Sequence, residues 1–307
     1  MFNFGFSPIQ IFGLIVVLAL VIAAGIWSYK YFTRHASYKD IFVPMPQNLR
    51  HDLFYGSYMC FQNQVNEVKD FVNLHWECFN EGLDKGFQNI REMQRFTVVD
   101  ISGVIFQPYK ANKPHMVLYD DYRQRLDAFI QQMREENLLH LVKVIVVIDE
   151  PNLNTTRSDF EQATLFVKDY VKTVPELAGV KMGVIYQGGV DTGYWAFEQY
   201  DIVGFDDYRR QSNIFSKDGE YNRMKAMLLG DQKIWLLPGG AKADGVPEQD
   251  PAAFEAVAHR DPEVFGIIMF LWADVGYEGI VGIRSIPKQQ DLYTNLGLRI
   301  LNLNTQV

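Results

Sequence analysis

The chain has 307 residues, of which 48% are hydrophobic and 21% charged, so it can bury a large core and is not intrinsically disordered. Its net charge of −8 argues against nonspecific binding to nucleic acid, and we expect no nucleic-acid partner. Cys60 and Cys78 have no metal-ligand spacing and form no Cys-x-x-Cys motif, so the sequence implies neither a zinc site nor a disulfide scaffold.

An uncharged apolar run comes first in the chain. Residues 11–29 are just long enough to cross a lipid bilayer, which takes about 17–25 residues. A cleaved signal peptide is the competing interpretation, but residues 2–10 lack the positive charge that such peptides carry. We therefore expect a single-pass membrane protein, with a bilayer anchor over 1–31, a tether over 32–51 and a large domain over 52–307.

Strand-like and helix-like segments alternate from residue 52 onward. The predicted strands are 55–61, 71–78, 96–101, 141–148, 180–186, 202–205, 233–237 and 265–272. The predicted helices are 64–70, 81–94, 118–138, 158–174, 193–200, 220–229, 251–259 and 288–301. Ser158, with Glu161 three positions later, fits a capping box at the start of the fourth helix.

This order predicts an α/β fold, a (β/α)8 TIM barrel preceded by a single N-terminal transmembrane helix. Eight strands alternating with helices over about 250 residues have the size and order of that barrel. A doubly wound open sheet is the alternative, but no glycine-rich phosphate turn follows the first predicted strand. Because the sequence carries no Walker, zinc-helix or Gly-x-Ser-x-Gly motif, we expect no cofactor and no metal.

Polar and aromatic residues follow the predicted strands, and in a barrel the carboxyl ends of all strands face one cleft. These residues are Gln62, Asn63, Glu77, Asp100, Asp149, Glu150, Tyr186, Gln187, Asp206, Tyr208, Trp272 and Asp274. Taken alone, Asp100 or Asp274 is typical of a turn or a helix cap, and Trp272 of a core. Together they form a rim with few basic groups, which suits a neutral polyhydroxylated ligand better than a phosphate.

The fourth predicted strand ends in Asp149-Glu150-Pro151, and with the strand order this motif resembles the clan A glycoside hydrolases over residues 52–303. That clan has (β/α)8 barrels with an acid/base Glu in an Asn-Glu-Pro at the end of the fourth strand. The resemblance implies that Glu150 is the proton donor. It also implies that Tyr208 and Trp272 bind substrate, and the same role is expected for Tyr186, Gln187, Glu77, Asp100 and Asp274.

The nucleophile of the clan has no counterpart at its usual place. The seventh predicted strand ends Leu237-Pro238-Gly239-Gly240, and the next acid is Asp244. Retaining hydrolysis needs two carboxyl groups about 5–5.5 Å apart and inversion about 6.5–9.5 Å.

Three alternatives stay open. In the first, Asp206, Glu77 or Asp100 supplies the second carboxyl group. In the second, Asp149 and Glu150 act as a pair, as in the substrate-assisted hexosaminidases, where the substrate's own acetamido group attacks. Successive strand residues point to opposite faces, so this pair can act only if the strand has ended by Asp149. In the third alternative, the barrel binds glycan or serves as a scaffold without cleaving.

The sequence thus favours a membrane-anchored glycosidase that cleaves or binds a polysaccharide, with Glu150 as general acid/base and Asp149 and Asp206 as its catalytic partners. The alternative is a catalytically inactive barrel that acts as a membrane-tethered glycan-binding or assembly protein. Lys30, Arg34 and Lys39 all follow the apolar run, so the positive-inside rule places the barrel in the cytoplasm. An enzyme of envelope polysaccharide would need it outside, and the sequence leaves the side open.

Overall fold

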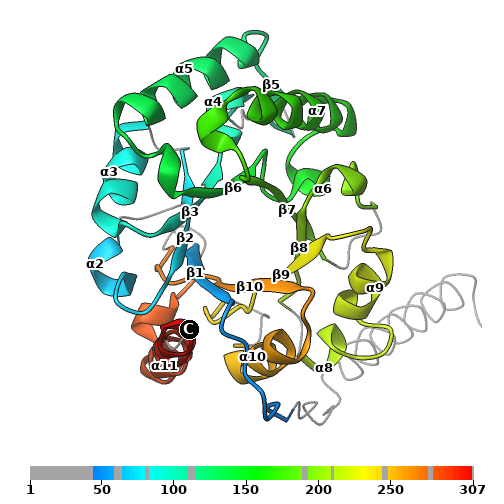
Figure 1. Cartoon of the computed structure of the whole chain (residues 1–307). Coiled ribbons are helices and arrows are strands. Elements are labelled where there is room, and N and C mark those ends of the chain that lie inside the picture. The colour runs from blue at the N-terminus through cyan, green and yellow to red at the C-terminus, as the bar shows by residue number, and fades with distance from the viewer. Residues whose placement is uncertain are drawn as a thin grey trace, which may run out of the picture. The chain divides into compact units, whose positions relative to one another are not determined.

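The predicted barrel is confirmed. The computed structural model describes residues 44–58, 64–79, 83–108, 115–188, 193–208, 211–243, 248–275 and 279–305. Eight parallel strands close in the order β1, β10, β9, β8, β7, β6, β3, β2 (Figure 1). They are β1 (Phe54–Tyr58), β2 (Leu74–Cys78), β3 (Phe96–Asp100), β6 (Val142–Val146), β7 (Lys181–Gln187), β8 (Ile202–Asp206), β9 (Lys233–Leu236) and β10 (Val264–Met269).

Helices form the layer around this barrel (Figure 1). They are α2 (Val65–Val68), α3 (Leu83–Met93), α4 (Ser102–Ile105), α5 (Tyr122–Glu135), α6 (Pro151–Asn154), α7 (Arg157–Thr173), α8 (Gln211–Ile214), α9 (Glu220–Met227), α10 (Pro251–Arg260) and α11 (Pro287–Asn304). Single 3-10 turns are η1 (Leu139–Leu141), η2 (Pro175–Leu177), η3 (Phe197–Gln199) and η5 (Ile283–Ser285). The predicted anchor over 11–29 lies outside the described residues, and none of the helices within them has the length and apolar character to cross a membrane.

Two tryptophans fill the interior of the barrel. Trp76 and Trp235 are fully buried there, with ring centroids 6.4 Å apart. Gly204 makes room for Trp235, because a Cβ on this glycine would lie 2.8 Å from the Cβ of the tryptophan. Gly183 is equally confined, since its Cβ would lie 2.7 Å from Cγ1 of Val144. The interior is therefore solid, and space for a ligand is left only toward the ends of the strands.

The structure differs from the predicted elements at several points, of which three bear on the argument. The fourth barrel strand, β6, ends at Val146, two residues earlier than predicted. Helix α7 is capped by Thr156, whose side chain accepts a hydrogen bond from the Asp159 N–H, so the predicted cap at Ser158 is wrong. Helix α4 and the two-stranded hairpin β4 (Phe106–Gln107) and β5 (Val117–Leu118) were not predicted, because each is too short to show a period.

Cys78 at the end of β2 is disulfide-bonded, although the cysteine spacing in the sequence implies no disulfide scaffold. The only other cysteine in the sequence, Cys60, lies outside the described residues. The two positions are 18 residues apart in the sequence and carry no spacing motif, so the bond could not be predicted from the sequence.

Candidate active site

A cavity of about 780 Å³ opens at the carboxyl ends of the barrel strands. Its polar lining includes Asp100 at the end of β3, Asp206 at the end of β8, and Asp149 and Glu150 shortly after β6. Tyr58, the last residue of β1, completes this set. The barrel thus brings four acids, from three places in the sequence, into one cavity.

Strand geometry explains why Asp100 and Asp206 reach the cavity. Side chains on a strand alternate between its two faces. On β3, Val98 lies in the barrel interior, so Asp100 two residues later points the same way. On β8, Ile202 lies in the interior, and the same period of two carries Asp206 to the cavity.

Asp149 and Glu150 both line the cavity although they are adjacent in sequence. The condition set by the sequence is met, because β6 ends at Val146 and the alternation of a strand no longer applies. Glu150 has left-handed backbone angles of φ 43° and ψ 59°, and its N–H donates to the carbonyl of Ile185 at 3.0 Å. The Asn154 side chain donates to the Asp149 carbonyl at 2.8 Å. A non-glycine residue held in this region is strained, and such strain gathers at functional sites.

The four carboxyl groups hold their protons more tightly than free acids do. Burial raises the pKa of Glu150 from its ordinary value of 4.5 to about 7 and that of Asp100 from 3.8 to about 6. Burial, and then the charges of Glu150 and Asp100, raises the pKa of Asp149 well above its ordinary value. Burial, and then the charges of Glu150 and Asp149, does the same for Asp206. At neutral pH the cluster therefore keeps at least one proton, which is what a general acid requires.

A tyrosine hydroxyl from β1 contacts one of these acids. The Tyr58 hydroxyl donates to Oδ2 of Asp149 at 2.8 Å, while Oδ1 of the same carboxyl group is buried without a partner. Oδ1 of Asp206 is likewise buried without a partner. Buried polar atoms are normally hydrogen-bonded, so these two oxygens are positioned to accept from a ligand.

Gly239, three residues after the seventh barrel strand, packs against Tyr208. A Cβ on Gly239 would lie 2.6 Å from the ring of Tyr208, so this position has no room for a larger side chain. The Phe270 ring stacks on the Tyr208 ring, with ring centroids 5.0 Å apart and an interplanar angle of 20°. Both rings line the cavity.

The cavity aromatic that follows β10 is thus Phe270, not the predicted Trp272. The Trp272 side chain is 1% exposed, its Nε1 donates to Glu67 at 2.8 Å, and its ring packs on Phe71. Trp272 therefore serves the packing between the barrel and its helix layer. The sequence could not show which of the two rings faces the cavity. The alternation of side chains between the two faces of the strand stops where β10 ends at Met269.

Four other predicted rim residues do not line this cavity. Glu77 faces the helix layer, where its carboxyl group accepts from the Asn89 side chain at 3.1 and 3.2 Å. Tyr186 is fully buried and donates to the carbonyl of Trp195 at 2.6 Å.

The remaining two of these residues are held by backbone contacts. The backbone of Gln187 pairs with the Asn152 side chain, which accepts at 2.9 Å and donates at 3.2 Å. The Asp274 carboxyl group accepts from the Gly282 N–H at 2.8 Å and from the Ser285 hydroxyl at 2.7 Å, so it orders its own loop. Gln62 and Asn63, also predicted at the rim, lie outside the described residues.

Tyr58 and Phe270 are the site residues that the sequence argument missed. Tyr58 was placed inside a longer strand, 55–61, and the end of β1 at Tyr58 is what brings it to the cavity. The alternation of Phe54, Gly56 and Tyr58 on the interior face was the available signal. Among the described residues, no group of three or more His, Cys, Asp or Glu side chains is arranged to hold a metal ion.

Comparison with known proteins finds likeness in structure only. No family model and no curated protein sequence matches the chain. The structure of N2152 from Neocallimastix frontalis matches 73% of this chain with a TM-score of 0.49 and 12% identity, and this chain spans 61% of its length. A GH113 beta-1,4-mannanase matches 81% of this chain with a TM-score of 0.44 and 10% identity, over 99% of its own length.

The beta-galactosidase from the psychrophilic Marinomonas ef1 is the comparison that bears on the fold. It matches 81% of this chain with a TM-score of 0.51 and 12% identity, and this chain spans 59% of its length. The described part of this chain therefore has a glycoside hydrolase-like (β/α)8 barrel fold.

Proposed function

We propose that this protein cleaves a glycosidic bond in a polysaccharide, with Glu150 as the general acid/base. The observation that carries the proposal is that Asp149, Glu150 and Asp206 line one cavity, where burial raises the pKa of all three and the charge of Glu150 further raises the pKa of both aspartates. A pKa of about 7 leaves Glu150 able to donate a proton to a leaving oxygen near neutral pH. Glycoside hydrolysis needs a raised acid and a second carboxyl group, and the cavity supplies both.

Asp206 is the partner that the geometry favours. It reaches the cavity from β8, whereas Asp149 adjoins Glu150 in the chain and is tied to Tyr58. The Glu150 charge is the largest charge effect on the pKa of Asp206 and also on that of Asp149, so the choice rests on Asp206 coming from a separate strand. This arrangement supports the two-carboxylate mechanism over the substrate-assisted one, in which Asp149 would orient an acetamido group.

The lining of the cavity supports a neutral glycan as the substrate. No Lys or Arg is among the described residues that line it, while Tyr58, Tyr119, Tyr208 and Phe270 contribute rings. Rings stack on the apolar faces of sugars, and carboxylates accept from sugar hydroxyls. A substrate rich in negative charge would meet four acids with no described cation to offset them.

The test measures turnover of a panel of aryl glycosides, chitin, mannan and peptidoglycan by wild type and four variants. Glu150→Gln is expected to lower kcat by about 10²–10⁴. Asp206→Asn is expected to lower it more than Asp149→Asn, and the reverse order would favour the substrate-assisted mechanism. Asp274→Asn is the control, because this acid does not line the cavity and accepts from the Gly282 N–H in its own loop. Equal turnover by wild type and Glu150→Gln would refute the proposal.

The second candidate is a barrel that binds glycan without cleaving it. The observation in its favour is that the ring of Tyr208 lies against Gly239, so a carboxylate has no room at this position after the seventh barrel strand. Saturable binding of an oligosaccharide by a wild type that turns over no member of the panel would establish this candidate.

We further propose that residues 11–29 anchor the protein in a membrane, with the barrel on the non-cytoplasmic side. The disulfide at Cys78 supports this side, because disulfides persist in oxidising compartments and are rare in the cytosol. The charges at Lys30, Arg34 and Lys39 argue for the opposite side. Protease protection of residues 50–307 in sealed vesicles of known orientation decides between the two.

A further inference from the structure

A second cavity, of about 620 Å³, lies at the opposite end of the barrel, where the strands begin. Its lining includes Phe54 at the start of β1, Phe96 at the start of β3, Lys181 at the start of β7 and Lys233 at the start of β9. It is separated from the candidate active site by the barrel interior, which Trp76 fills. The features of this cavity therefore have no part in the proposed hydrolysis.

The floor of this cavity is aromatic. Phe54 stacks on Phe265 with ring centroids 4.7 Å apart and an interplanar angle of 19°. Phe96 meets Phe54 edge-on, with ring centroids 5.9 Å apart, and the residue is 44% exposed. The exposed part of these rings is an apolar surface at this end of the barrel, and such a surface can mark a ligand site.

The wall of the cavity is basic. Lys143 lies over the rings of Phe54 and Phe96, with its Nζ 5.8 and 5.3 Å from their centroids. The Lys233 ammonium donates to the carbonyl of Pro262 at 3.1 Å, and Lys181 lies 3.9 Å from Asp201. Among the described residues no carboxylate pairs with Lys143 or Lys233, on a chain whose net charge is −8.

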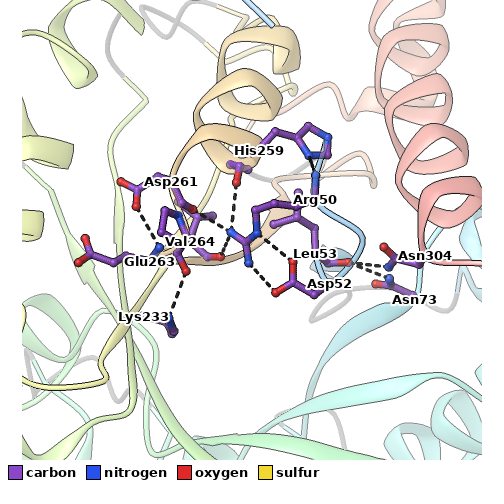
Figure 2. Close-up of polar contacts among 12 residues, drawn as sticks. Arg50, Asp52, Leu53, Asn73, Lys233, His259, Asp261, Glu263, Val264 and Asn304 are labelled. Carbon is purple, nitrogen blue, oxygen red and sulfur yellow. Dashed lines mark hydrogen bonds and ion pairs between the residues drawn. The ribbon is translucent and has the colours of Figure 1, made fainter. Parts of the chain in front are cut away.

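Arg50, shortly before β1, is held at this end of the barrel by several hydrogen bonds. Its guanidinium donates to Asp52 and to the carbonyls of Ala258, Asp261 and Val264, at 2.7–3.2 Å (Figure 2). Asp52 is the only acid among the described residues that line the cavity. It is paired with Arg50 and also feels the charge of Lys233, so the lysines supply the net charge of the lining.

We propose that this mouth of the barrel binds a phosphate-bearing anion, the headgroup of an acidic phospholipid. Lysines attract the phosphate, and the open aromatic floor accepts the apolar part next to it. The preceding part of the chain is a poor occupant, because residues 30–40 carry Lys30, Arg34 and Lys39 against one acid and so repeat the charge of the cavity. This site lies beyond the proposed hydrolysis and does not rest on it.

The test uses the full chain in a neutral detergent and measures Kd by calorimetry for three probes. These are dihexanoylphosphatidylglycerol, dihexanoylphosphatidylcholine and inorganic phosphate. The double variant Lys143→Gln/Lys233→Gln is expected to bind the phosphatidylglycerol about 30-fold more weakly, at about one factor of five per lysine. Lys143→Arg/Lys233→Arg is expected to restore binding. Lys172→Gln/Lys217→Gln changes the net charge equally at exposed positions away from the cavity and is the control.

The proposal predicts that phosphatidylglycerol binds more tightly than phosphatidylcholine, and that only the Gln variant of the cavity loses this preference. Equal affinity of wild type and the Lys143→Gln/Lys233→Gln variant would overturn the site. Inorganic phosphate binding as tightly as the lipid would overturn the assignment to a lipid headgroup. Unfolding midpoints of all variants in urea show that a loss of binding is not a loss of fold.

Discussion

Tyr58 donates a 2.8 Å hydrogen bond to Asp149, joining the first barrel strand to the loop after the fourth across 91 positions of sequence. The contact holds one acid of the candidate site in place, while Glu150 beside it lines the same cavity. It also opposes the rise in the pKa of Asp149 that burial and the neighbouring acids cause. The same hydroxyl therefore bears on both the geometry and the charge of the site.

Replacing this tyrosine by Tyr58→Phe removes the donor and keeps the ring. We expect the free energy of unfolding at pH 7 to fall by about 1–3 kcal/mol, because a buried carboxyl oxygen loses its partner. Urea denaturation measures the change. Tyr170→Phe is the matched control, since that hydroxyl donates to Asp127 at the surface, and we expect its effect to stay within about 0.5 kcal/mol. Equal losses in the two variants would contradict the role given to Tyr58.

Glu150 makes stability depend on pH. Its pKa is raised from 4.5 to about 7 on folding, so the folded state binds more protons than the unfolded state between these values. Stability then falls as the pH rises through this window. Glutamine does not titrate in this range. Between pH 5 and pH 8 we therefore expect the unfolding free energy of Glu150→Gln to fall by about 2–3 kcal/mol less than that of wild type.

The measurement is a series of urea curves for wild type and Glu150→Gln at pH 5, 6, 7 and 8. Glu161→Gln, at an exposed position on α7, controls for the loss of one surface charge. Parallel stability profiles for wild type and Glu150→Gln would show that the pKa of Glu150 is not raised by folding.

The Phe270 ring lines the cavity, whereas the Trp272 ring is buried in the core. Phe270→Leu removes the ring that stacks on Tyr208 at the cavity, and we expect KM for the hydrolysed glycan to rise about 3- to 10-fold. Trp272→Phe loses the hydrogen bond to Glu67, and we expect stability to fall by about 1 kcal/mol with KM unchanged. A higher KM in Trp272→Phe than in Phe270→Leu would reverse the assignment.

The barrel was predictable from the sequence because each strand is a short apolar run and each long helix has its own period, as in α5 and α11. Glu150, Asp149, Asp206, Tyr208 and Asp100 were predictable at the cavity because they follow strands whose order was clear. Glu77 and Trp272 show the limit of such reasoning. Whether a side chain at a strand end faces the cavity or the helix layer depends on the residue at which the strand ends, and a shift of one position reverses the face.

The disulfide at Cys78 could not be predicted from the sequence, and it leads to a further prediction. A bond between the two cysteines of the chain closes a loop of about 19 residues and is worth about 3 kcal/mol of stability. We expect dithiothreitol to lower the thermal midpoint of wild type and to leave that of Cys78→Ser unchanged. Thiol titration of the purified, unfolded chain checks the bond directly, and two reactive thiols without reductant would contradict it.

The cap of helix α7 gives the sharpest local test, because two hydroxyl residues lie two positions apart and only one of them caps. Thr156 accepts a hydrogen bond from the Asp159 N–H at 3.2 Å, whereas Ser158 already lies within the helix. We expect Thr156→Ala to lower the free energy of unfolding by about 1 kcal/mol. Ser158→Ala is expected to change it by less than about 0.5 kcal/mol, since alanine is the better helix former. Urea denaturation of both variants decides the matter, and a larger loss in Ser158→Ala would restore the capping box that begins at Ser158.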